Sequence, residues 1–223
     1  MSGVEIQIAL LSLKVAAVAT VAALPVAVLI AFALAKPGWR GRGLVNVVVH
    51  LPLVLPPVVT GYALLVLFGP TAPLGQALAS FGIVFAFNWT GAALAAAVMA
   101  FPLMVRAIRL SMEAVDPGLP DAARTLGAPR FWAFALVTLP LALPGIIAGA
   151  VLGFAKALGE FGATITFVSN IPGETRTLPL AIYTALQAPG GEAAAGRLVL
   201  VSLLISFAAL IGAEWLGRRG GRS

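Results

Sequence analysis

Long apolar runs alternate with short polar or proline-rich breaks along this chain. A helix needs about 20 mostly apolar residues to cross a bilayer. Five runs meet that length: Ile6–Ala35, Leu44–Phe68, Trp89–Met112, Phe134–Leu158 and Leu198–Leu216. A sixth, Leu74–Phe87, contains Gly75 and Gly82 and follows Pro73, so we expect an interfacial or re-entrant segment there. The pattern predicts an all-α membrane protein with five transmembrane helices.

The composition agrees with a lipid environment. Hydrophobic residues make up 61% of the 223 residues and charged residues only 10%, whereas soluble domains carry about 25% charged residues. The net charge of +6 is spread along the chain, so we expect no nucleic-acid partner. With no cysteine and a single histidine, His50, the sequence also predicts no metal site.

The distribution of basic residues predicts the orientation, because positively charged loops stay in the cytoplasm. Ten of the fourteen basic residues fall on one side if the N-terminus is periplasmic and the C-terminus cytoplasmic. These ten are Lys36, Arg40, Arg42, Arg106, Arg109, Arg124, Arg130, Arg218, Arg219 and Arg222. The opposite orientation would leave them outside.

The third loop carries a predicted two-turn helix. Pro120 suits the first helical position, and Asp121 in the first turn suits the helix dipole. Gly127 suits a left-handed residue after the helix end, and a second helix is expected from Arg130. So short a helix is marginal in water. It is therefore either a loop packed on its own membrane helices or a docking helix for a soluble partner.

The spacing within this loop resembles the EAA-x3-G-x9-I-x-LP signature of ABC-importer permeases. Aspartate replaces the first glutamate and valine replaces the isoleucine. The matching residues are Asp121, Ala122, Ala123, Gly127, Val137, Leu139 and Pro140. Three further stretches are similar to the molybdate permeases of bacterial inner membranes: Leu51–Gly69, Phe101–Arg109 and Leu158–Pro179.

This resemblance implies a type I ABC importer permease of MetI-like fold in the bacterial inner membrane. It implies one transmembrane domain over residues 1–223, with the permease core at about 9–216, a cytoplasmic coupling loop at about 113–133 and a periplasmic loop at about 170–196. The expected function is ATP-driven import of molybdate by alternating access. Tungstate or sulfate import is the alternative, and a proton-coupled secondary transporter is a more distant one.

The resemblance also implies the partners. Two copies of the chain would form the pore as a homodimer, two cytoplasmic ATP-binding subunits would dock on the coupling loop, and a periplasmic molybdate-binding protein would deliver the anion. The sequence lacks the G-x-x-x-x-G-K-[ST] phosphate loop. We therefore expect a transport subunit that is not itself an enzyme and holds no cofactor, with ATP and Mg bound by the partner ATPase.

Five residues of the fourth apolar run are candidates for the transport pathway or for helix packing. Gly145, Gly149 and Gly153 form a bare stripe, which allows close helix approach either as static packing or as a sliding surface. Lys156 and Glu160 are four residues apart and can pair. Both can also snorkel to water; alternatively, Lys156 guides an oxyanion or Glu160 relays protons.

Two other features leave alternatives open. Pro52, Pro56 and Pro57 disturb the second run, which predicts either a hinge lining a cavity or a static kink. The loop 170–196 predicts a turn followed by a short helix, and suits either contact with a periplasmic donor protein or a plug over the pore mouth.

Overall fold

The structure is a computed structural model that describes residues 2–36 and 38–220. Within these ranges every regular element is a helix, which confirms the all-α prediction. The helices are α1 Gly3–Ala35, α2 Arg42–Val54, α3 Pro57–Phe68, α4 Pro73–Ala79, α5 Trp89–Glu113, α6 Gly118–Thr125, α7 Arg130–Ala133, the π-helical turn η1 Phe134–Thr138, α8 Leu139–Leu141, α9 Leu143–Leu158, α10 Gly162–Val168, α11 Leu178–Gln187 and α12 Glu192–Gly220.

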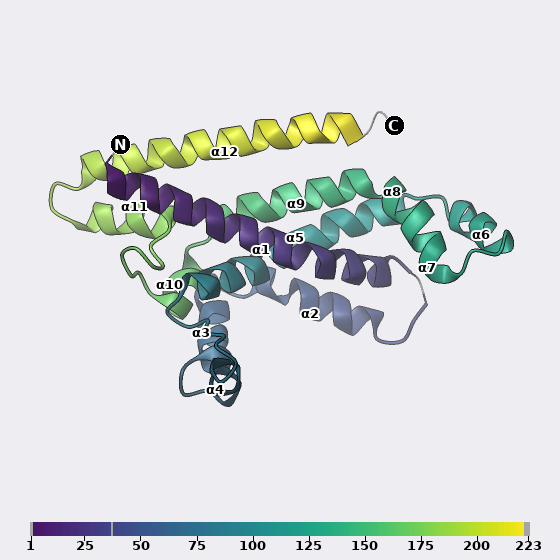
Figure 1. Ribbon diagram of the computed structural model, residues 1–223, viewed down its shortest axis with the longest axis horizontal. Helices are drawn as coiled ribbons and strands as arrows, with labels where there is room; N and C mark the ends of the chain where they lie inside the picture. Colours follow the sequence, from purple (N-terminus) through teal and green to yellow (C-terminus); the bar gives the residue numbers. More distant parts are fainter. Residues whose placement is uncertain (1, 37, 221–223) are drawn as a thin grey trace.

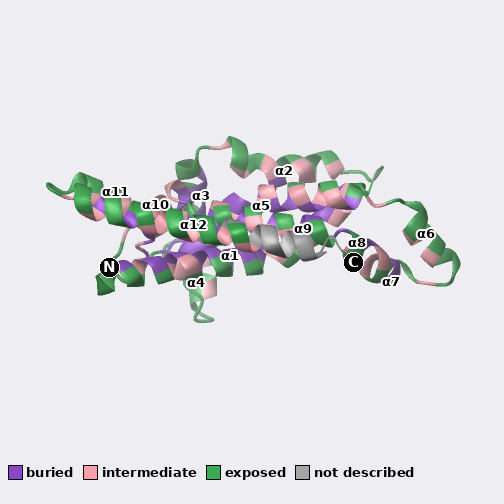
Figure 2. Cartoon of the chain, turned by 90° about the horizontal axis from the view of Figure 1, so that it is seen from above, coloured by how far each residue is buried: buried purple, intermediate pink, exposed green. Residues whose placement is uncertain are grey.

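Helices α1, α5 and α9 pack side by side as the centre of an elongated bundle (Figure 1). Helix α5 carries the most continuous buried surface, whereas α12 lies on the outside and is largely exposed over residues 192–209 (Figure 2). The two termini lie at opposite ends of the bundle. The short helices α6, α7 and α8 lie beyond the end at which α12 finishes.

Small side chains allow α1 and α5 to pack closely. Most buried positions of α1 are alanines, spaced three or four residues apart between Ala16 and Ala31, and they face a second alanine-rich helix, α5. Small residues permit close backbone approach, the usual basis of helix packing in membranes. The buried alanines are Ala9, Ala16, Ala19, Ala23, Ala27 and Ala31 on α1, and Ala92, Ala93, Ala95, Ala96 and Ala100 on α5.

Among residues 2–36 and 38–220, three stretches are long and apolar enough to cross a membrane as continuous helices: α1, α5 and the part of α12 from Glu192 to Ala209. Two more cross only if each bent helix pair counts as one span. The pair α2–α3 bends by 113° and the pair Arg130–Leu141 with α9 bends by 69°. The second apolar run, Leu44–Phe68, is therefore broken as the prolines predicted, because Pro56 and Pro57 each lack the N–H that would continue α2.

Other boundaries also differ from expectation. The segment Leu74–Phe87 forms only the short helix α4 and then an irregular loop, in which Gly82 and Phe87 have positive φ. Helix α12 begins at Glu192, six residues before the predicted start at Leu198. Much of the expected loop 170–196 is consequently helical, with α11 where a short helix was predicted.

Candidate functional site

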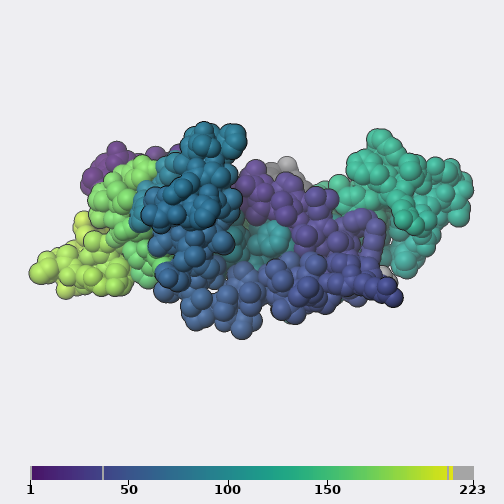
Figure 3. All heavy atoms as spheres, turned by 90° about the horizontal axis from the view of Figure 1, so that it is seen from below, coloured from purple at the N-terminus to yellow at the C-terminus, as the bar shows by residue number. Residues whose placement is uncertain are grey.

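Helix α6 projects beyond the bundle and contacts α7 and η1 (Figure 3, the teal mass at one end). It spans Gly118–Thr125, so Pro120 is its third residue, and the prediction of Pro120 as its first residue was wrong. Asp121 accepts a hydrogen bond from Arg124 at 3.2 Å, and both side chains are exposed. None of its described residues is buried. The helix therefore has no buried face within this chain.

Gly127 ends α6 in a left-handed conformation, with φ of 96°. Its N–H donates to the carbonyl of Arg124, and the N–H of Ala128 donates to the carbonyl of Ala123, both at 3.0 Å. These two bonds define the Schellman motif, a C-cap that satisfies the last carbonyls of a helix and reverses the chain. The predicted left-handed glycine is confirmed, and it fixes the direction in which the chain leaves α6.

Leu139 and Pro140 lie at the start of α8, where the π-helical turn η1 gives way to α-helix. Pro140 has no N–H to donate one turn back, and π-turns occur where the regular ladder is interrupted. Together with Pro144, this weakens the helix around Ala142, where the 69° bend falls. We call α6, the turn at Gly127 and α7 (residues 118–133) the α6 hairpin. Leu139 and Pro140 thus lie at a bend between this hairpin and α9.

A pocket of about 400 Å³ lies between the α6 hairpin, the ends of α1 and α5, and η1. Lys36, Arg124 and Arg130 are among its lining residues, as are Glu113 and Asp121. Lys36 lies 3.8 Å from the centre of the Phe32 ring, a cation–π contact. Partial burial and the nearby positive charges of Arg130 and Arg124 lower the pKa of Lys36. Three basic side chains and two acidic ones therefore line the pocket beside α6.

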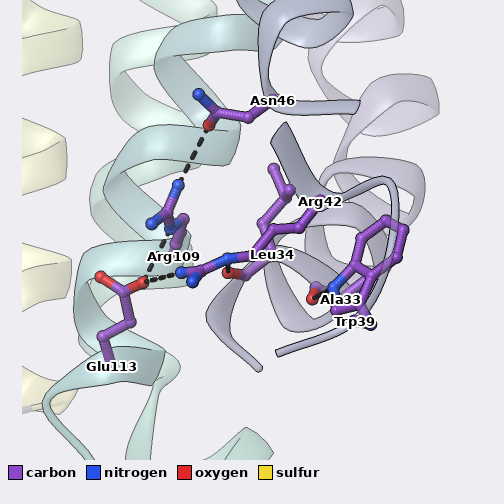
Figure 4. Close-up of polar contacts among 7 residues, drawn as sticks. All are labelled: Ala33, Leu34, Trp39, Arg42, Asn46, Arg109 and Glu113. Carbon is purple, nitrogen blue, oxygen red and sulfur yellow. Dashed lines mark hydrogen bonds and ion pairs between the residues drawn. The ribbon is translucent and has the colours of Figure 1, made fainter. Parts of the chain in front are cut away.

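One ion-pair network beside this pocket was missed by the sequence reading (Figure 4). Glu113, the last residue of α5, accepts hydrogen bonds from Arg109 at 2.8 Å and from Arg42 at 3.3 Å. Arg109 also donates to Asn46 at 3.0 Å. The i, i+4 spacing of Arg109 and Glu113 was a visible signal. The contacts with Arg42 and Asn46 join residues more than sixty positions apart, and no local pattern marks them.

The glycine stripe of α9 faces α5 within the same chain. A Cβ on Gly145 would overlap the side chain of Ser111, and one on Gly149 would lie 2.9 Å from Ile108. One on Gly153 would lie 2.6 Å from the Met104 side chain. In this structure the three glycines therefore serve close packing between α9 and α5.

Lys156 and Glu160 form an ion pair at 2.6 Å, which confirms the predicted pairing. Glu160 does not snorkel to water, since its side chain is only 2% exposed. Its second oxygen accepts the N–H of Ala163 at 3.1 Å, near the start of α10. The pair lies at the other end of α9 from the α6 hairpin, so the candidate residues form two separate sites.

The first comparison is with known sequences. The chain is 58% identical to the "Molybdenum transport system permease protein ModB" of Escherichia coli K12, over 96% of this chain and 94% of that protein. The corresponding protein of Haemophilus influenzae is 53% identical over the same shares. The "Sulfate transport system permease protein CysT" of Salmonella typhimurium is 37% identical, over 86% of this chain and 70% of that protein.

Solved structures share the fold. A bacterial alginate ABC transporter, solved in complex with an alginate pentasaccharide-bound periplasmic protein, matches with a TM-score of 0.77 and 18% identity, over all of this chain and 81% of its own. An inward-facing MetNI methionine ABC transporter matches with a TM-score of 0.69 and 14% identity, over 99% of each chain. At these identities the likeness is one of fold, the MetI-like type I importer permease fold.

Residues 23–221 match the family described as "Binding-protein-dependent transport system inner membrane component". This match covers most of the chain, and the sequence relatives extend it to nearly the whole length. Multi-pass insertion in the inner membrane follows from the family and from the apolar helices. The chain therefore belongs to the family of inner membrane components of binding-protein-dependent transport systems, which are transport subunits.

Proposed function

We propose that this chain is the permease subunit of an ATP-driven molybdate importer and that two copies form the translocation pathway. The observation that carries this proposal is the exposed α6 hairpin, whose Asp121, Ala122, Ala123 and Gly127 match the ABC-permease signature. A helix of eight residues with no buried residue gains its stability from a partner. We propose molybdate as the transported anion because the chain is 58% identical to a molybdenum transport permease.

The coupling partner is a pair of cytoplasmic ATP-binding subunits, each docked on one α6 hairpin. ATP and Mg belong to those subunits, since the sequence of this chain has no phosphate loop. ATP-driven closure of the pair would push on α6, and the chain would pass that motion to the spans. Alternating access of the dimer then carries the anion inward. Purified permease, free of partners, should bind no nucleotide.

The orientation that serves this mechanism has α6 in the cytoplasm and the N-terminus in the periplasm. It is supported by the positive-inside rule and by the arrangement of the helices, because α6 lies at the end of the bundle opposite the N-terminus (Figure 1). Lys36 lines the pocket beside α6, and Arg42 contacts Glu113 at the same end of α5. A periplasmic molybdate-binding protein would then meet the end formed by α11 and the start of α12. With each bent pair counted as one span, five spans satisfy this orientation.

Transport by reconstituted protein tests the proposal. The permease is purified with the ATPase of its own organism and placed in liposomes with molybdate-loaded binding protein outside and ATP inside. We expect ATP-dependent molybdate uptake. Tungstate and sulfate are offered in parallel, each with its own loaded binding protein, because tungstate is nearly isosteric with molybdate. ATP-independent uptake driven by a proton gradient would overturn the proposal in favour of a secondary transporter.

A further inference from the structure

Glu113 ties the end of α5 to the beginning of α2 (Figure 4). A single carboxylate oxygen, Oε1, receives both Arg109 from its own helix and Arg42 from the first residue of α2. Arg42 also donates through Nε to the carbonyl of Leu34, near the end of α1, at 2.8 Å. The carboxylate therefore joins α5 to α2, and Arg42 links both to α1. Arg109 adds a second link to α2 through Asn46.

The connection from Glu113 to α6 is short and hydrogen-bonded. Four residues, 114–117, separate it from Gly118, where α6 begins. Ala114 donates its N–H to Leu110, and Gly118 donates its N–H to the Asp116 carboxylate at 2.9 Å. Leu119 and Asp121 donate back to Asp116 and Pro117. A displacement of α6 would therefore also displace the end of α5, because this short, hydrogen-bonded connection cannot extend far.

Beyond Glu113, the path continues into the bent pair α2–α3. Helix α3 leaves α2 at 113° and packs on α10. That packing is close, because a Cβ on Gly162 would lie 2.8 Å from the Pro57 side chain. The loop after α10 returns to α1, where Ser12 Oγ accepts the N–H of Leu178 at 2.7 Å. A chain of close contacts thus joins α2, through α3 and α10, to the far end of the bundle.

The network does not hold the fold together. The buried side chains Met104, Ile108 and Met112 already anchor this end of α5 in the core. By contrast, the side chains of Arg42, Arg109 and Glu113 are all between a quarter and a third exposed. Ion pairs with this exposure are weakened by solvent and contribute little to stability. Such a contact can break and form again within a transport cycle.

We propose that Glu113 is a positioning residue for transport, which carries the displacement of the coupling helix α6 to α2 through its contact with Arg42. This inference rests on the proposed function, since it assumes that a partner moves α6. Arg109 has a supporting role: it lies one turn back on α5 and holds the carboxylate toward Arg42. Without the carboxylate, only the hydrogen bond from Arg109 to Asn46 and the packing of α2 on α5 would link the two helices.

The first experiment compares ATP hydrolysis with molybdate uptake in the reconstituted transporter. Glu113→Gln keeps the size of the side chain and removes its charge. We expect ATP hydrolysis to continue while molybdate carried per ATP falls about two- to fivefold, the change that corresponds to one exposed ion pair. Arg42→Gln should have the same effect. The double variant should lose less than the two single variants added together, because both remove the contact between Glu113 and Arg42. The rest of each loss comes from the Arg109 pair in Glu113→Gln and from the Leu34 carbonyl in Arg42→Gln.

The matched control is Arg197→Gln. It breaks another ion pair between helices, Arg197, whose side chain is 58% exposed, with Glu5, whose side chain is 9% exposed, at 2.8 Å and at the opposite end of the bundle. Its molybdate-to-ATP ratio should equal that of the unmodified transporter. The role of Glu113 would be overturned if both single variants kept the unmodified ratio of molybdate to ATP. It would also be overturned if the double variant lost as much of this ratio as the two single variants added together. Equal loss in Arg197→Gln would do the same, since it would reveal a general effect of lost ion pairs.

A second experiment separates this inference from the choice of cargo. The chain contains no cysteine, so cysteines introduced at the exposed Leu44 and Ala114 carry spin labels at defined positions. An excess of unlabelled chain during assembly leaves one labelled copy in each complex, so that one distance is measured. In the assembled complex, addition of ATP should leave the distance between the labels narrow and unchanged. In Glu113→Gln the distribution should broaden or shift. If the variant keeps the narrow distribution, the link is refuted, whichever anion is transported; absence of molybdate uptake by the unmodified transporter refutes only the proposed function.

Discussion

The N–H of Gly127 donates to the carbonyl of Arg124 at 3.0 Å while Gly127 itself is left-handed, with φ of 96°. No atom lies within 4 Å of the position that a Cβ would occupy there. The requirement for glycine is therefore one of backbone conformation and not of space. This distinction leads to a graded set of substitutions.

Gly127→Val should weaken association of the ATPase and lower molybdate uptake while the protein still reaches the membrane. A Cβ in the left-handed region costs about 1–2 kcal/mol, and a β-branched residue fits worse. Gly127→Asn should be milder, because asparagine tolerates this region. Co-purification of the ATPase and uptake are measured together. Gly196→Val is the control, since Gly196 has open space and lies within α12. Full ATPase binding and uptake by Gly127→Val would refute the role of this turn.

Asp121→Ala should have a smaller effect than Gly127→Val. The exposed carboxylate stabilises the helix by about 0.3–1 kcal/mol through the helix dipole. Its ion pair with Arg124 is also exposed and contributes a similarly small amount to stability. Asp121→Glu, which restores the residue of the signature, should retain full activity. The readout is again ATPase co-purification. Complete loss of the ATPase in Asp121→Ala would mean that the carboxylate contacts the partner directly.

The orientation can be measured with single cysteines, because the natural chain has none. A membrane-impermeant maleimide added to intact cells should label Gln187→Cys, at the exposed last residue of α11. Leu126→Cys, at the highly exposed end of α6, should react only after the inner membrane is permeabilised. The reverse pattern would contradict the proposed orientation of the chain.

The sequence predicted those features that depend on local chemistry. Apolar length located α1 and α5, Gly127 marked the end of α6, and the spacing of Lys156 and Glu160 predicted their ion pair. These signals act within one or two helical turns. The start of α6 was misplaced because Pro120 is tolerated anywhere in the first turn, and the chain uses Pro117 as its N-cap.

Features that depend on distant residues could not be predicted in the same way. Three prolines showed that the second apolar run is disturbed, but the 113° bend is set by packing of α3 on α10. Arg42 looked like a residue that only sets orientation, and its contact with Glu113 spans 71 positions. The direction in which a long charged side chain points depends on which helices become neighbours, and that is a property of the whole bundle.

The glycine stripe of α9 should tolerate no branched side chain. In Gly149→Val, the added Cβ would lie 2.9 Å from Ile108 and 3.1 Å from the carbonyl of Met104. Overpacking of this kind costs about 1–3 kcal/mol. We expect a lower thermal inactivation temperature in detergent, with Gly196→Val as the matched control. Unchanged thermal stability would mean that α9 and α5 separate easily, as a sliding surface requires.

Replacement of Lys156 alone should lower the stability of the protein more than replacement of both Lys156 and Glu160. The Glu160 side chain is 2% exposed, so in Lys156→Met its charge stays buried with the N–H of Ala163 as its remaining partner. Breaking a buried pair in this way costs about 3–5 kcal/mol. The double variant Lys156→Met/Glu160→Gln removes both charges, and the Gln carbonyl can still accept the N–H of Ala163. We expect it to recover most of the lost stability.

The same double variant separates the two interpretations of Lys156. If the lysine only neutralises Glu160, the double variant should transport molybdate at close to the unmodified rate once it is stable. If Lys156 guides the oxyanion, a stable double variant should still transport slowly. We expect the first result, because the Lys156 Nζ already lies 2.6 Å from a Glu160 oxygen. An anion there would compete with a charge that is held in place by burial. Thermal inactivation and initial uptake rates, measured on the same preparations, distinguish the two outcomes.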